Sequence, residues 1–150
     1  DVLDYLPADH KDRDALIANL KNSLDALLKV TDPTTGLWYQ VLDHVGEEGN
    51  YIEGSGSLMY IYAMAKGANN GYLDANYKTI ANEKFDAVLK TLVTENEDGT
   101  LTLSNVCGGC GLGGNPYRDG SYEYYITEKV VTNDTKGVGP FILAALELDR

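Results

Sequence analysis

Residues 36–66 read GLWYQVLDHVGEEGNYIEGSGSLMYIYAMAK, and this stretch decides the fold. From about residue 55 to residue 66 the segment predicts a helix with apolar side chains on nearly every side. A helix of this kind must be enclosed by other elements, whereas a surface helix carries one apolar stripe. The aromatic, amide and carboxylate side chains just before it are therefore expected at a mouth, where a binding site can form.

Further helices follow from the spacing of apolar residues. Residues 12–30 and 77–93 place apolar side chains three and four positions apart with polar residues opposite, which is typical of outer-layer helices. A second apolar helix is expected over residues 141–146, opened by Gly139-Pro140. The first six residues are expected to be the tail of an inner helix that Pro7 stops. Gly67 is expected to close the helix of residues 55–66 in a left-handed conformation.

The two halves of the chain repeat one order of elements: amphipathic helix, turn, short extended segment, loop and apolar helix. The turns lie at Gly36 and Gly99, and the extended segments, residues 37–41 and 100–104, carry residues that favour short strands. Helix-pair repeats need neighbours to bury their inner faces. We therefore expect an all-α architecture of antiparallel helix-pair repeats with short strands in the loops. An N-terminal part of the same domain, or copies of the chain, would cover its inner face.

The charge balance excludes some partners. The chain has 23 acidic and 12 basic residues and a formal net charge of −11, which repels nucleic acid and anionic membrane surfaces. No stretch approaches the length of a membrane span, and no leader is expected from the first residues of this sequence. The chain is expected to be soluble, with cytoplasm and periplasm both left open. Eleven tyrosines suit both half-buried packing and sugar contacts.

Four blocks of sequence, in order, resemble one family. They are GLWYQVLD at residues 36–43, NYIEGSGSLMYIYAMAKG at residues 50–67, NVCGGCGLGG at residues 105–114 and NDTKGVGPFILAA at residues 133–145. Together they are similar to glycoside hydrolase family 105, the unsaturated rhamnogalacturonyl hydrolases, and more distantly to the unsaturated glucuronyl hydrolases of family 88. The resemblance implies that residues 1–150 are the C-terminal portion of a single (α/α)6-barrel domain.

The resemblance also implies a chemistry. Enzymes of this family remove a 4,5-unsaturated uronic acid from oligosaccharides by hydrating its vinyl ether, with an aspartate that protonates the double bond and activates water. A carboxylic acid of raised pKa suits that task. In the family this aspartate and an RGNGW-like motif lie in the N-terminal half, and neither is present here. No catalytic residue is therefore assigned, no cofactor is expected, and the isolated chain is expected to be inactive. The alternative is a non-catalytic helical module that binds carbohydrate or associates with itself.

Several residues are candidates for binding an oligosaccharide substrate. Trp38 and Gln40 could stack on a sugar and bond its hydroxyls, although Trp38 could equally plug the gap between strand and helix. Glu53 could accept sugar hydroxyls or cap the free N–H groups of the helix start. Ser55 belongs to a run of small residues that permits close approach of a ligand or of another helix.

Lys136 and Tyr124 complete this candidate set. Lys136, before the last helix, could hold an anionic sugar group together with the positive helix end, or could be a surface lysine. Tyr124 could line the same loop or merely pack.

Cys107 and Cys110 have the C-x-x-C spacing of metal and redox sites. A zinc site needs two more ligands, and the two histidines, His10 and His44, are not paired at ligand spacing. No metal is expected, while a disulfide stays open as an alternative. The resemblance places this glycine-rich loop near the cleft and favours Cys107 as a buried thiol.

Overall fold

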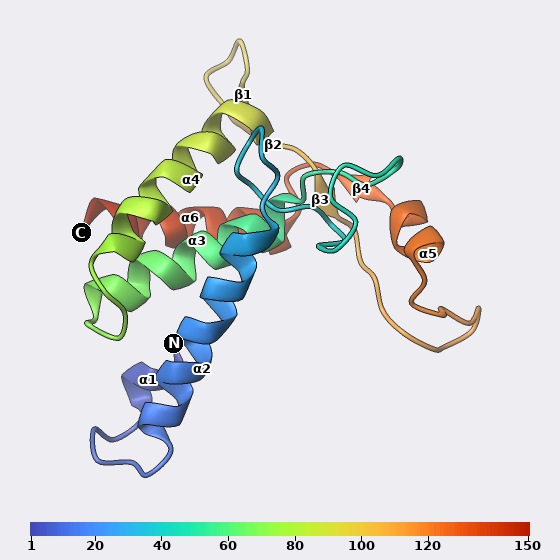
Figure 1. The fold of residues 1–150 in the computed structure, drawn as a ribbon. Helices are drawn as coiled ribbons and strands as arrows, with labels where there is room; N and C mark the ends of the chain where they lie inside the picture. The colour runs from blue at the N-terminus through green and yellow to red at the C-terminus, as the bar shows by residue number, and fades with distance from the viewer.

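The computed structural model describes residues 1–150 and consists of helices joined by loops that carry four short strands (Figure 1). The helices are α1 (Val2–Tyr5), α2 (Arg13–Leu27), followed by a turn of 3₁₀ helix (Leu28–Val30), α3 (Gly54–Asn69), α4 (Asn76–Leu92), α5 (Tyr122–Thr127) and α6 (Thr135–Asp149). The strands are β1 (Val93–Glu95), β2 (Leu101–Leu103), β3 (Val106–Cys107) and β4 (Val130–Val131). The predicted helical class with short strands in the loops is confirmed. None of these helices combines the length and apolarity that a membrane crossing requires.

The two apolar helices form the centre of the fold. α3 and α6 pack along each other, and α4 packs against both, as the green, yellow-green and red ribbons show (Figure 1). α2 approaches α3 from the other side through its buried Leu24. The largest fully buried side chains of the core come from α3, α4, β3 and the loop before α3: Leu58, Ile61, Met64, Val88, Leu92, Val106, Leu37 and Trp38. The expected layers, outer α2 and α4 and inner α3 and α6, are therefore present.

The internal repeat is visible in the turns and helix starts. Gly36 and Gly99 both adopt left-handed conformations, with φ of 73° and 80°, where a side chain would be strained. Each inner helix begins after an acidic residue, Glu53 for α3 and Asp134 for α6, whose carboxylate accepts hydrogen bonds from the first turn. The two units, α2 with α3 and α4 with α6, thus share a left-handed glycine turn and an acidic cap at the start of the inner helix.

The extended segments differ between the two units. Residues 101–103 form β2, which pairs antiparallel with β1 in the register Val93 to Leu103. Residues 37–41 form no strand, only a single bridge between Tyr39 and Ile52. The strand prediction is thus correct for the second unit and wrong for the first, where Leu37 and Trp38 turn into the core instead.

The start of α6 corrects the sequence-based prediction. The helix begins at Thr135, not at Pro140, because the Asp134 carboxylate accepts the Lys136 N–H and provides an earlier cap. Pro140 consequently lies inside the helix, where its missing N–H removes one backbone hydrogen bond. Lys136 is therefore in the first turn of α6 rather than before it.

Gly67 also has a different role from the predicted one. It lies within α3, which continues to Asn69, and the left-handed residue beyond the helix is Gly71, with φ of 71°. A Cβ at Gly67 would lie 2.5 Å from Leu73 Cδ1, so the absence of a side chain permits the following loop to pack on the helix. Gly67 is a packing glycine and not a helix cap.

We expect Gly137→Ala in α6 to lower the free energy of unfolding. The new Cβ would lie 2.7 Å from Val106 Cγ2 and 2.9 Å from Leu103 Cδ2, both buried. The overpacking exceeds the gain in helix propensity of about 1 kcal/mol, for a net loss of about 1–2 kcal/mol in urea unfolding. In a Val106→Ala background the same substitution should cost less. An unchanged or raised stability in the single variant would contradict the close packing of α6 on β3.

Candidate functional site

The starts of α3 and α6 and the turn after β3 surround a hollow of about 300 Å³. Its lining comes from both units of the repeat: Gln40, Glu53, Ser55, Gly56 and Met59 from the first, and Cys107, Gly109, Cys110 and Lys136 from the second. The first-turn N–H groups at both helix starts already donate to Glu53 and Asp134, so Lys136 supplies the positive charge that the lining offers to a ligand. The hollow presents this ammonium group beside amide and carboxylate oxygens, and we call it the inter-unit hollow.

Glu53 connects the two units at the floor of the inter-unit hollow. Its Oε1 accepts from the Ser55 N–H at 3.1 Å and the Ser55 hydroxyl at 2.8 Å, and its Oε2 accepts from the Gly56 N–H at 2.6 Å. Oε1 also accepts from the Cys107 N–H at 2.9 Å, across 54 residues of sequence. With 6% of its surface exposed, Glu53 is a helix cap and a tie between elements. The capping alternative is thus present in the structure, with the carboxylate still facing the hollow.

Gln40 separates the inter-unit hollow from a smaller one of about 130 Å³. Its amide donates to Cys107 Sγ at 3.3 Å and lies 4.0 Å from Cys110 Sγ. The smaller hollow is formed by aromatic and polar side chains around Gln40: Trp38, Tyr39, Leu42, Glu53, Gly56, Ser57 and Tyr60. Gln40 therefore presents a hydrogen-bonding group to both hollows.

Lys136 supplies the positive charge of the site. Its ammonium group lies 2.8 Å from Asp134 Oδ1, and its side chain is about half exposed at the rim of the inter-unit hollow. The hydrogen bond from Lys136 lowers the pKa of Asp134 below its usual range. Lys136 is thus held at the start of α6 by the same carboxylate that caps that helix.

Trp38 and Tyr124 do not lie where a sugar-stacking role would put them. Trp38 is 1% exposed, its Nε1 donates to the Leu27 carbonyl at 2.8 Å, and Tyr60 packs edge-on against its ring. This is the plug alternative, since no ring face of Trp38 is free. Tyr124 is on α5 and its hydroxyl accepts from the Gly111 N–H at 3.0 Å, outside the lining of the hollow. Gln40, Glu53, Ser55 and Lys136 do come together.

Sequence reasoning missed three lining residues as site residues: Met59, Cys107 and Cys110. Met59 is 46% exposed although it lies on an apolar helix, one turn after Ser55, so helical spacing from the cap could have identified it. The cysteines come from a segment far along the chain, which the Glu53 bond to Cys107, the Gln40 bond to Cys107 Sγ and the Gly54 bond to the Asn105 carbonyl hold at the hollow. No cluster of three or more histidine, cysteine or acidic residues is placed to hold a metal ion, and both cysteines are free thiols.

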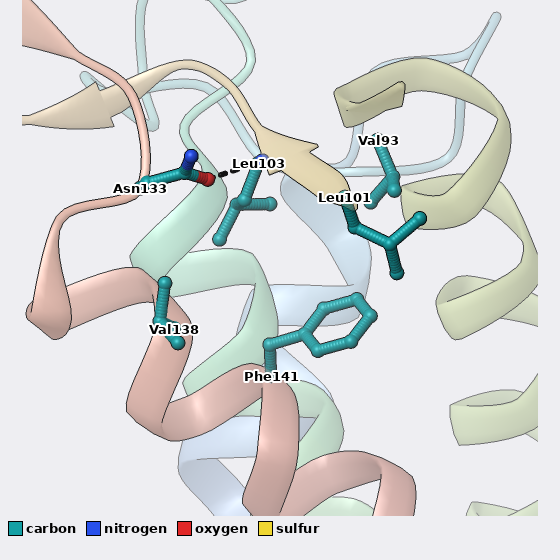
Figure 2. Close-up of a pocket in the computed structure, with 6 residues that line it drawn as sticks. All are labelled: Val93, Leu101, Leu103, Asn133, Val138 and Phe141. Atoms are coloured by element: carbon teal, nitrogen blue, oxygen red, sulfur yellow. Dashed lines mark hydrogen bonds between the residues drawn. The ribbon is translucent and has the colours of Figure 1, made fainter. Parts of the chain in front are cut away.

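A separate apolar hollow of about 90 Å³ lies between β1, β2 and α6 (Figure 2). Val93, Leu101, Leu103, Val138 and Phe141 point into it, and its one polar residue, Asn133, uses its Oδ1 to accept the Leu103 N–H at 2.8 Å. Such a lining offers nothing to a charged sugar. Figure 2 therefore shows a gap in the packing around the hairpin, not the candidate site.

The loop between Gln40 and Tyr51 is held against α5, a helix that the sequence analysis did not predict. His44 stacks on Tyr122 with ring centroids 4.3 Å apart, and the Tyr122 hydroxyl donates to the Glu48 carbonyl at 2.9 Å. The Glu47 carboxylate, 2.8 Å from His44 Nδ1, raises the pKa of His44 above its ordinary value of 6.5, with smaller contributions from Asp43 and Glu123. This contact anchors the loop that carries Gln40.

The whole chain, residues 1–150, matches the family model described as Glycosyl Hydrolase Family 88. Protein Atu3128 of Agrobacterium fabrum (strain C58 / ATCC 33970) is 42% identical in an alignment of 118 positions that covers 75% of this chain and 51% of that protein. The 24.9 kDa protein in picA locus of Rhizobium radiobacter matches with the same identity and coverage. The chain spans about half the length of the curated relatives it matches.

Solved structures agree with this match. A family 105 glycoside hydrolase from C. acetobutylicum ATCC 824 superposes with a TM-score of 0.95 and 46% identity, over 98% of this chain and 41% of that chain. A family 88 glycosyl hydrolase from Bacteroides vulgatus has a TM-score of 0.64 at 23% identity, over 97% of this chain and 38% of that chain, and so shows likeness of fold alone. The predicted relation to helical-barrel enzymes is confirmed.

Replacing Glu53 by alanine should be costly because several donors lose their acceptor at once. Glu53→Ala leaves two helix-start N–H groups and the buried Cys107 N–H without a partner, which is expected to lower the free energy of unfolding by about 2–4 kcal/mol. Asp134→Ala is the matched control, since it removes the cap of the other inner helix without a tie to a distant strand. Urea unfolding of both variants measures the difference. Equal losses would mean that the bond to Cys107 contributes nothing.

The His44 contact predicts a pH dependence. Because the folded-state pKa is raised, its stabilisation is fully present below the ordinary value of 6.5 and is lost as the pH rises through the raised pKa. His44→Phe keeps a ring against Tyr122 but cannot titrate. The stability of the original protein relative to this variant should therefore be greater at about pH 6 than at about pH 8.5 in urea unfolding. A difference independent of pH would contradict the role of the charged imidazole.

Proposed function

Since this chain belongs to Glycosyl Hydrolase Family 88, we propose that it forms one wall of the cleft of an enzyme that removes unsaturated uronic acids from oligosaccharides. The observation that carries the proposal is the inter-unit hollow, in which four predicted residues, Gln40, Glu53, Ser55 and Lys136, meet at two helix starts. A uronic acid carries one carboxylate and several hydroxyls. The Lys136 ammonium group suits the carboxylate, and the Gln40 amide and the Glu53 carboxylate suit the hydroxyls.

The proposed reaction hydrates the vinyl ether of the unsaturated sugar, after which the hemiketal opens and the sugar is released. In this scheme the chain binds and orients the substrate, while an aspartate from an N-terminal half protonates the double bond and activates water. We propose accordingly that residues 1–150 are the C-terminal portion of one barrel domain. The chain belongs to a glycoside hydrolase family, and the family 105 relative, at 46% identity, supports its proposed place in an enzyme of that kind.

Exposed apolar side chains on the inner helix α6 support the proposal that another part of the protein packs against it. Ile142, Leu143 and Leu146 on α6 are exposed, and this helix consists largely of apolar residues. In the proposed enzyme the N-terminal half of the barrel covers this surface. The same surface is the observation that favours the second candidate function, a module without catalysis that binds carbohydrate and associates with its own copies.

The proposal is tested by following the near-ultraviolet absorbance of an unsaturated uronyl disaccharide. We expect no loss of absorbance with residues 1–150 alone, and turnover with a protein in which an aspartate-bearing N-terminal half precedes them.

In that longer protein, Lys136→Met should raise KM roughly 3- to 10-fold with kcat little changed, because an exposed cation contributes a modest attraction to the substrate. The increase in KM should be smaller at high salt, which screens this attraction.

Lys90→Met is the matched control, since it removes the same charge from α4, away from the hollow. Robust turnover by residues 1–150 alone would show that the chemistry lies within them. Sugar binding without turnover by the longer protein would favour the non-catalytic module.

A further inference from the structure

Two thiols that the proposed function does not use lie together in the wall of the inter-unit hollow. Cys107 is buried at the end of β3, and Cys110 is exposed three residues later. One side-chain amide, that of Gln40, lies 3.3 Å from Cys107 Sγ and 4.0 Å from Cys110 Sγ. These are the two cysteines of the chain, so neither has another partner in it.

The backbone between the two thiols turns back on itself. Cys107 is fixed because its N–H donates to Glu53 and because β3 pairs with β4 through Val130. The Gly108 N–H donates to the Lys129 carbonyl at 2.7 Å, and a Cβ at Gly108 would lie 2.8 Å from that oxygen. Gly109 has a φ of 153°, which a glycine adopts without strain. The two glycines thus permit the turn that returns Cys110 to Cys107.

We propose that Cys107 and Cys110 form a reversible dithiol–disulfide site on the wall of the hollow. The oxidant is a small-molecule disulfide such as oxidised glutathione. The Cys110 thiolate attacks one sulfur of that disulfide, which forms a mixed disulfide and releases one thiol. Cys107 then attacks Cys110 Sγ and releases the second thiol. The two cysteines lose two protons and two electrons, and the small disulfide leaves as two thiols.

The order of attack follows from exposure. Cys110 is exposed to the solvent, whereas Cys107 is buried, so a small disulfide in solution meets Cys110 first. Burial and then the neighbouring Cys107 raise the pKa of Cys110, while the Gln40 amide opposes this shift. Exchange is therefore slow at neutral pH and faster as the pH rises, because the thiolate is the attacking species. The inference stands on these contacts and does not depend on the proposed substrate.

Oxidation alters the surface that faces a ligand. In the dithiol form the Gln40 amide donates to a thiol, and Cys110 lines the hollow beside Gly109. In the disulfide form Cys110 is bound to Cys107, so the loop is tethered to β3 and the amide loses its thiol partner. The redox state of this pair thereby sets the shape of one wall of the hollow.

The experiment equilibrates the purified protein in buffers of varied reduced and oxidised glutathione, followed by acid quenching, alkylation and tryptic digestion. Trypsin releases both cysteines in the single peptide of residues 91–118, between Lys90 and Arg118. We expect this peptide to pass from two alkyl groups to none, without retained glutathione. The synthetic peptide of residues 91–118 is the control, and the folded protein should oxidise with an equilibrium constant about tenfold or more above it. Glutathione retained on Cys110, or an equilibrium constant below that of the peptide, would overturn the proposal.

A second measurement tests the role of Gln40 in this pair. The hydrogen bond from the Gln40 amide lowers the pKa of Cys110, and Gln40→Leu removes it. The rate of Cys110 alkylation by iodoacetamide should therefore rise at a higher pH in Gln40→Leu than in the original protein. The difference should vanish in denaturant, where both proteins expose the same thiols. Identical pH profiles of the two folded proteins would contradict the hydrogen-bonded arrangement.

Discussion

The buried carboxylate of Glu53 is the interaction on which the site depends. It accepts hydrogen bonds from the first turn of α3 and from the Cys107 N–H of β3, so one side chain determines where a helix begins and where a distant strand lies. Buried carboxylates need several donors to offset their loss of water. Glu53 finds them in groups that the fold would otherwise leave unpaired. The arrangement of the inter-unit hollow follows from this set of hydrogen bonds between the carboxylate and the N–H groups.

The elements with strong local patterns could be predicted from the sequence. α2 and α4 have one apolar stripe over four turns or more, and their predicted ranges agree with the structure to within a few residues. α6 was predicted to start too late because glycines and Pro140 weaken the helical pattern of its first turns, while the Asp134 cap that starts it is a single residue. α5 was not predicted, since six residues rich in tyrosine show no helical period.

The candidate site could be predicted only where its residues lie beside a helix start. Glu53 and Ser55 were identified because a carboxylate and a run of small residues precede or open an apolar helix. Lys136 was identified as a cation beside the positive end of another. Trp38 was assigned to the cleft as one alternative because a lone tryptophan near polar residues is ambiguous between packing and binding, and its burial depends on Leu27 and Tyr60 from other segments. Met59 lies one turn after Ser55 on α3, so helical spacing could have identified it, whereas the cysteine pair reaches the hollow only through tertiary packing, which no local pattern encodes.

The position of the hollow between the two units has a consequence for how its specificity can be altered. One unit supplies Gln40, Glu53 and Ser55, and the other supplies Lys136 and the thiols, so neither unit encloses the space without the other. Exposed lining residues such as Met59 and Lys136 can be exchanged on one wall while the side chains of the opposite wall stay the same. The selectivity of the hollow can therefore be changed from either side of the repeat.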